Sequence, residues 1–332
     1  MGGLHASVQR RIDALLDDAE ASRTIVVASH GDADALKRRA SRGQLASPAK
    51  NLYARDAYWS DLDPAERALH LMRAEASRHP TWRFRSYSAA LVWGLDVPHA
   101  LVIIADRPPN APHCRARRPS SRDDYALRDG MNVTSFWQTV AECLCEAPFS
   151  YGLAIADSAL HMRGTTNEEL LDRLSIADDR TGIAQARLIA SCADGRAENG
   201  GESRVRAYLI AQGYQIPELQ VEFPNPTDPA HPYRVDFFWG LIGPRGTIGE
   251  FDGMGKYRDP QLLNGRTTIE VLVAERQRES RLTLLGHPVL RFTYQDLLHP
   301  IRLSRALESA GIPRDHVEAR RWHDAWNQVK RH

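Results

Sequence analysis

The chain has 332 residues, a net charge of +1, 26% charged residues and 42% hydrophobic residues. These values are typical of a globular protein and exclude a disordered tail and a strongly basic nucleic-acid coat protein. No apolar run approaches the ~20 residues of a spanning helix, so we expect no membrane partner. The N-terminus lacks the pattern of a secretion signal, and the four cysteines lack CxxC spacing. We therefore expect a cytoplasmic protein with free thiols.

The first predicted zone, residues 1–95, contains a basic helix followed by a hairpin. Apolar spacing predicts a helix over 8–19, and residues 24–27 predict a strand. Asp32 or Asp34 is expected to cap the basic helix, and a turn-rich segment then joins two short strands. This order is typical of a winged helix-turn-helix, although the pattern alone favours a solvated helix face beside an unrelated turn. The predicted contacts to DNA are Lys37, Arg38, Arg39, Arg42 and Lys50.

The second predicted zone, residues 96–197, is a mixed α/β linking domain. It has a strand-like run over 100–105, an arginine-rich stretch over 107–128 and several helices that begin near residue 135. The arginines fit either phosphate contact or a solvated loop. The small and polar residues 192–201 predict a linker to the next zone.

The third predicted zone, residues 198–332, has the order αβββαβ. A helix follows the turn at Asn199 and stops by Gly213, and strands are predicted over 219–223, 233–239 and 247–252. A long helix over about 268–285, a strand over 288–292 and short helices complete the chain. We therefore predict an α/β protein, α+β overall, whose last zone places a mixed sheet between helices.

Acidic residues interrupt two of these apolar strands. Asp236 lies between Val235 and Phe237, and Glu250 lies between Gly249 and Phe251. A carboxylate in an apolar strand is costly unless it binds something, and two carboxylates on neighbouring strands suit Mg²⁺.

These strand acids predict a Mg²⁺ or Mn²⁺ site at Asp236 and Glu250. The ion would activate a water that attacks a phosphodiester. Glu202, at the start of the preceding helix, is predicted to orient a metal-bound water, and Lys256 to stabilise charge on the phosphate. A structural interpretation stays open, in which the acids form ion pairs with Arg204, Arg234, Lys256 or Arg291.

Residues 200–298 resemble a PD-(D/E)XK nuclease-like domain of the very-short-patch-repair type. The resemblance is carried by Arg234-Val235-Asp236-Phe237, by Gly249-Glu250-Phe251-Asp252-Gly253 with Lys256, and by 274–279 with Val289-Leu290-Arg291. It implies a restriction-endonuclease-like fold, Asp236 and Glu250 as metal ligands and Glu202 as a supporting acid. Asp252 stands where the family has a lysine, so Lys256 replaces that lysine or the domain binds without cleaving.

The upstream chain resembles abortive-infection antitoxins of the AbiEi type. The matching segments are 42–45, 51–54, 85–90 with Gly94-Leu95, 132–135 and 156–160. This resemblance implies an N-terminal winged-helix-like domain, a helical antitoxin-like domain and a role in phage defence or a toxin–antitoxin system.

Three functions are compatible with the sequence. The first is a DNA-associated, Mg²⁺-dependent endonuclease-like protein. The second is a non-catalytic antitoxin that represses transcription from its operator DNA and binds a partner toxin. The third is an interaction scaffold without a nucleic-acid role.

Overall fold

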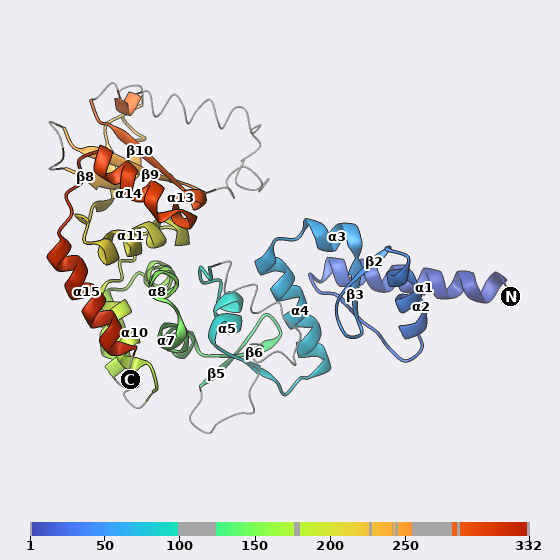
Figure 1. Ribbon diagram of the computed structural model, residues 1–332. Coiled ribbons are helices and arrows are strands. Elements are labelled where there is room, and N and C mark those ends of the chain that lie inside the picture. The colour runs from blue at the N-terminus through green and yellow to red at the C-terminus, as the bar shows by residue number, and fades with distance from the viewer. Residues whose placement is uncertain are drawn as a thin grey trace. The chain divides into compact units, whose positions relative to one another are not determined.

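The computed structural model describes residues 2–98, 124–175, 180–225, 228–240, 242, 245–253, 281–283 and 286–330. The chain forms two compact units, Met1–Cys143 and Leu144–His332. The described elements combine helices with three small sheets, so the predicted α+β class is confirmed (Figure 1). In the described part of the chain, no helix has both the length and the apolar character to cross a membrane.

The N-terminal unit begins with a small antiparallel sheet packed against two helices. The sheet order is β1-β3-β2, and the buried side chains of Ile12, Leu16 and Leu36 belong to its core. The predicted first helix, first strand, basic helix and hairpin are all present. Their bounds are α1 (Gly2–Ala21), β1 (Val26–Val27), α2 (Ala33–Ser41), β2 (Leu45–Ala49) and β3 (Leu52–Arg55).

The prediction that Asp32 begins the basic helix is confirmed, but the capping contact expected of its side chain is not formed. Asp32 occupies the N-cap position of α2, but its side chain makes no capping hydrogen bond. It accepts hydrogen bonds from Ser29 Oγ at 2.7 Å and from Arg11 Nε at 2.9 Å. An ion pair to α1 therefore replaces the local cap, and the hydrogen bond from Ser29 contributes most to lowering the pKa of Asp32.

The same unit contains a second sheet, of order β4-β6-β5. Glu142, which lies outside the sheet, links two of the antitoxin-like segments: it accepts hydrogen bonds from Arg85 Nη2 at 2.7 Å, from the Ser86 N–H at 2.9 Å and from Thr134 Oγ1 at 3.4 Å. The remaining elements are α3 (Asp56–Asp61), α4 (Pro64–Arg78), β4 (Arg83–Phe84), α5 (Ser86–Trp93), β5 (Tyr125–Arg128), β6 (Met131–Thr134) and α7 (Phe136–Glu146), which spans the division between the units.

Helices α8, α10, α11 and α15 pack together in the C-terminal unit. The predicted linker 192–201 is not a loose connection, since Ala197 is buried there and the Asp194 N–H donates to Asp157 of α8 at 2.7 Å. The buried side chains of Ala193 and Ala197 therefore anchor the linker to the core. The helices are α8 (Phe149–Arg163), α9 (Asn167–Ser175), α10 (Ile183–Ser191), α11 (Gly200–Gln212) and α15 (His316–Val329).

A four-stranded mixed sheet completes this unit, with strand order β10-β9-β8-β7. β7, β8 and β9 pair antiparallel, whereas β10 pairs parallel to β9. The predicted helix over 268–285 lies outside the described residues except for 281–283. The other elements are β7 (Glu218–Phe223), β8 (Tyr233–Trp239), β9 (Thr247–Asp252), β10 (Val289–Thr293), α13 (Tyr294–Leu298) and α14 (Pro300–Ser309).

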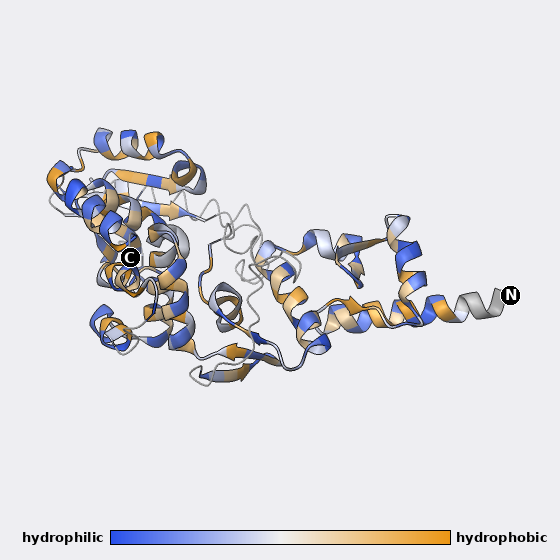
Figure 2. Ribbon diagram, turned by 60° about the horizontal axis from the view of Figure 1, so that its bottom comes forward, coloured by the Kyte–Doolittle hydropathy of each residue, from blue (hydrophilic) through white to orange (hydrophobic). Residues whose placement is uncertain are grey.

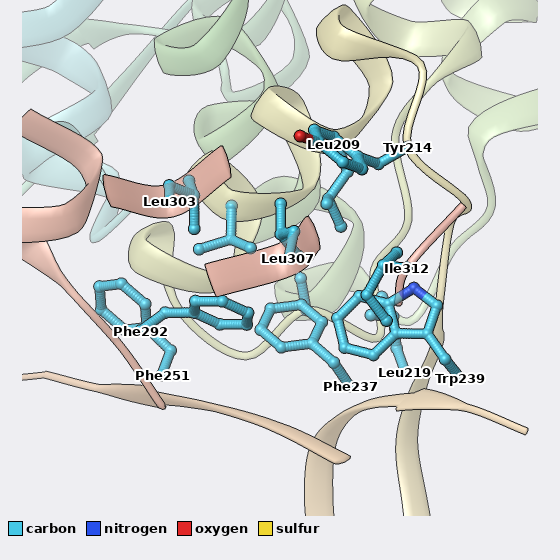
Figure 3. Close-up of a cluster of buried hydrophobic side chains, with 12 residues drawn as sticks. Leu209, Tyr214, Leu219, Phe237, Trp239, Phe251, Phe292, Leu303, Leu307 and Ile312 are labelled. Carbon is cyan, nitrogen blue, oxygen red and sulfur yellow. The ribbon is translucent and has the colours of Figure 1, made fainter. Parts of the chain in front are cut away.

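One face of this sheet supplies the aromatic half of a core. Phe237, Trp239, Phe251 and Phe292 point from the strands toward leucines of α11 and α14 (Figure 3). The strands are coloured largely as hydrophobic, with hydrophilic positions between (Figure 2). Gly249 is required by this packing, because a Cβ there would lie 3.0–3.1 Å from Trp239, Phe237 and Phe292.

Candidate active site

The ladder between β8 and β9 ends at the two strand acids. Residue pairs run from Trp239 with Thr247 to Phe237 with Gly249. The next pair in this register would be Asp236 with Glu250, but the described residues do not continue the ladder there. Instead, the Phe251 N–H donates to Asp236 Oδ2 at 2.7 Å. The carboxylate of Asp236 therefore lies against the backbone that carries Glu250.

The alternation of side chains along β8 is interrupted at Asp236. Phe237 belongs to the cluster facing α11, while Val235 packs with Ile248 in a second cluster. Residues two apart normally share a face, so the strand is irregular at the residue between them. This irregularity gives the side chain of Asp236 access to the Phe251 N–H and places the acid at a break in the sheet.

Glu250 is buried at 6% exposure, and the alternation of β9 directs it to the face opposite Gly249 and Phe251. On that face, the parallel register pairs Arg291 of β10 with Glu250. Arg291 Nη1 also donates to both carboxylate oxygens of Asp252 at 2.9 Å. Asp252, at the position where the PD-(D/E)XK domains that the chain resembles have a lysine, thus forms an ion pair with Arg291.

Glu202 is a buried acid in the first turn of α11, with 2% exposure. Its carboxyl oxygens accept hydrogen bonds from the Glu198 N–H at 2.8 Å, from Gln220 Nε2 at 3.1 Å and from Asn199 Nδ2. Burial, reinforced by the negative charge of Asp236, raises the pKa of Glu202 to about 8. Burial thus favours the protonated form of this carboxyl.

Gln220 and Asn199 belong to the site although the sequence did not single them out. Gln220 lies opposite Asp236 between the paired residues of β7 and β8, and its φ of +56° is in the left-handed region. Asn199 caps α11 by accepting hydrogen bonds from the Gly201 and Glu202 N–H groups. The available signals were a polar residue inside an apolar strand and an Asn before two glycines.

The donor set fits Mg²⁺ with two protein carboxylates. Magnesium commonly keeps several waters and binds one or two carboxylates, which Asp236 and Glu250 supply. Within the described ranges, no group of three His, Cys, Asp or Glu side chains suits a metal ion, so Glu202 does not complete a three-acid cage. Lys256, predicted to assist at the phosphate, lies outside the described residues.

The five residues predicted to contact DNA, on or next to α2 and in the hairpin, fall into two groups. Arg39 Nη1 donates to Asp13 at 2.6 Å and Arg39 Nε donates to Gln44 at 3.2 Å, so it holds α2 to α1. The other four side chains are exposed and form no ion pair with any described acid. They are Lys37, Arg38, Arg42 and Lys50.

Comparison with known proteins gives two partial matches. The chain is 37% identical over 87 residues to two Mycobacterium tuberculosis proteins described as uncharacterized, from strains CDC 1551 and H37Rv. The match covers 26% of this chain and 31% of each relative. No family model matches the chain, and no solved structure matches it.

Proposed function

We propose that the protein is a DNA-associated, Mg²⁺-dependent phosphodiesterase of the endonuclease type, with Asp236 and Glu250 as the metal ligands. The observation that carries the proposal is the break between β8 and β9 at these two acids. Acids at a strand break inside an apolar sheet are stabilised when they bind a cation. The described order α11, β7, β8, β9, β10 and the mixed sheet are compatible with the resemblance to PD-(D/E)XK domains, and the helix predicted between β9 and β10 lies outside the described residues except for 281–283.

The residues of the chain have separate roles in this proposal. When bound, Mg²⁺ polarises the phosphodiester and lowers the pKa of the attacking water. Asp236 and Glu250 hold the ion, and the Phe251 N–H fixes the carboxylate of Asp236. Glu202 and Gln220 hold α11 against β7 beside Asp236, so Glu202 is a positioning residue.

The test is hydrolysis of labelled duplex DNA and single-stranded DNA by the full chain, with Mg²⁺, Mn²⁺ or EDTA. Asp236→Asn keeps an acceptor for the Phe251 N–H but removes the charge. Loss of a metal ligand costs several kcal/mol of transition-state stabilisation, so we expect cleavage to fall at least about a hundredfold. Glu222→Gln, at an exposed position of β7, is the matched control. Metal-independent cleavage, no cleavage by the wild type or full activity of Asp236→Asn contradicts the proposal.

The second candidate is the non-catalytic antitoxin that represses transcription, and the four exposed cations of α2 and the hairpin favour its DNA-binding part. Each phosphate contact contributes about 0.9 to the slope of log K against log salt. A protein with both Lys37→Ala and Arg38→Ala should therefore bind its upstream DNA with a slope about two units shallower. Exposed Arg305→Ala with Arg320→Ala is the control, and an unchanged slope in the α2 variant would show that this helix does not bind DNA.

A further inference from the structure

A groove of about 270 Å³ lies in the C-terminal unit where α8, α11, α13 and α15 meet. Its described lining is apolar and aromatic, apart from Ser150 and Arg204, and includes no acid. Ala207 and Ala211 lie one turn apart on α11 and leave this space open. The groove therefore offers one positive charge in largely apolar surroundings.

Arg204 has no acidic partner among the residues that the structure describes, and its Nε is buried without a hydrogen-bond acceptor. Its guanidinium carbon lies 5.3 Å from the ring centre of Tyr151 and 5.9 Å from that of Tyr294. Arg206, two residues along the same helix, differs from Arg204 in that it forms an ion pair with a described acid, Asp157. A buried donor without an acceptor is costly, so the rings hold Arg204 in position for an external acceptor.

The aromatic wall of the groove is preformed. The rings of Phe149 and Trp322 are 4.4 Å apart, and Trp322 stacks on Trp326 at 5.6 Å. Little side-chain ordering is then required when an apolar group binds beside Arg204, and such preorganisation favours affinity.

Helices α13, which contributes Leu297 to the groove, and α14 also carry exposed apolar side chains. Leu298 is 63% exposed and Ile301 is 70% exposed. The Tyr208 hydroxyl, which lines the groove, donates to the Pro300 carbonyl at 3.0 Å and so connects the groove to Ile301. Aliphatic surface of this kind is typical of protein contacts and contributes little to binding a nucleic-acid backbone.

We infer that the groove binds an apolar segment of a partner protein that places one carboxylate on Arg204. A single guanidinium matches a single carboxylate in charge and can donate two parallel hydrogen bonds to it. The neighbouring aromatic wall and the exposed side chains of α13 and α14 accept the apolar part of the segment. The residues that line this groove do not include those of the proposed phosphodiesterase site.

The probes are acetyl-Leu-Phe with a free carboxylate and the same peptide with a terminal amide, titrated calorimetrically against the full chain. We expect the carboxylate to bind at least about tenfold more tightly, since hydrogen bonds between charged groups are the stronger class. Arg204→Gln should abolish this preference, whereas Arg305→Gln and Asp236→Asn should keep it. The Asp236→Asn result separates this inference from the proposed hydrolysis.

Ser150→Asp provides a second variant that keeps Arg204. It places a carboxylate in the groove lining and should lower the affinity for the peptide carboxylate at least tenfold, even if Arg204→Gln does not fold. The inference is overturned if the two peptides bind equally or not detectably. It is also overturned if Ser150→Asp still prefers the peptide carboxylate to the amide. Tighter binding of adenosine monophosphate than of the peptide also overturns it, in favour of a nucleotide.

Discussion

Replacement of Arg206 by alanine is expected to lower the free energy of unfolding by about 3–5 kcal/mol, because it leaves a buried carboxylate without its cation. Asp157 of α8 is 0% exposed, and Arg206 Nη1 of α11 lies 2.5 Å from its Oδ2. Arg206 Nη2 also donates to the Cys192 carbonyl at 2.9 Å. This single side chain therefore joins three segments of the C-terminal unit.

The loss of unfolding free energy in Arg206→Ala should depend on pH. Burial raises the pKa of Asp157 from 3.8 to about 6, so the folded state retains a proton that the unfolded state releases. This contribution to stability is complete below pH 3.8 and is lost as the pH rises to about 6. Without Arg206, we expect a higher pKa and a larger loss of stability at pH 8 than at pH 5.

Urea unfolding at pH 5 and at pH 8 measures this effect. Arg196→Ala is the matched control, since its ion pair with Asp194 lies at the surface and should contribute within about 1 kcal/mol. A loss below about 1 kcal/mol for Arg206→Ala, or the same loss at both pH values, would show that the buried pair does not hold α8 to α11.

Glu202→Gln is expected to stabilise the metal-free protein at high pH. The pKa of Glu202 rises from 4.5 to about 8 on folding, so between these values the folded state binds the additional proton. Stability therefore falls as the pH rises through this range. Glutamine resembles the protonated acid and removes this penalty.

Urea unfolding in EDTA at pH 5 and pH 9 measures the free energy of unfolding of Glu202→Gln and of the wild type. We expect Glu202→Gln to be close to the wild type at pH 5 and more stable by several kcal/mol at pH 9. The exposed Glu222→Gln should match the wild type at both values. A Glu202→Gln protein that gains no stability at pH 9 would falsify the assignment of a protonated, buried Glu202.

Local signals were sufficient to predict most elements of the C-terminal unit. The Asn199 turn and Gly213 bound α11, and Gly213 adopts the left-handed φ of +71° expected at a helix end. The strands β7, β8, β9 and β10 follow the predicted ranges to within about one residue. Alternation and turn residues act over a few positions, so one sequence is enough to read them.

Contacts between distant segments could not be predicted in the same way. Arg206 and Asp157 are 49 residues apart, and Asp32 pairs with Arg11 rather than with its own helix. The hydrogen bond from Phe251 to Asp236 depends on where a ladder breaks, which alternation alone does not encode. The sequence thus indicated the acids of the candidate site but not the strand break that holds them.

Binding of Mn²⁺ to the full chain, measured by titration calorimetry, tests the proposed site most directly. Asp236 and Glu250 should together bind one ion, and Asp236→Asn or Glu250→Gln should weaken binding at least tenfold, because each removes one of two charged ligands. Glu222→Gln should bind as the wild type does. Saturable binding that disappears with either acid is the expected result, and no binding, or binding unchanged in both variants, would contradict a cation site at the strand break.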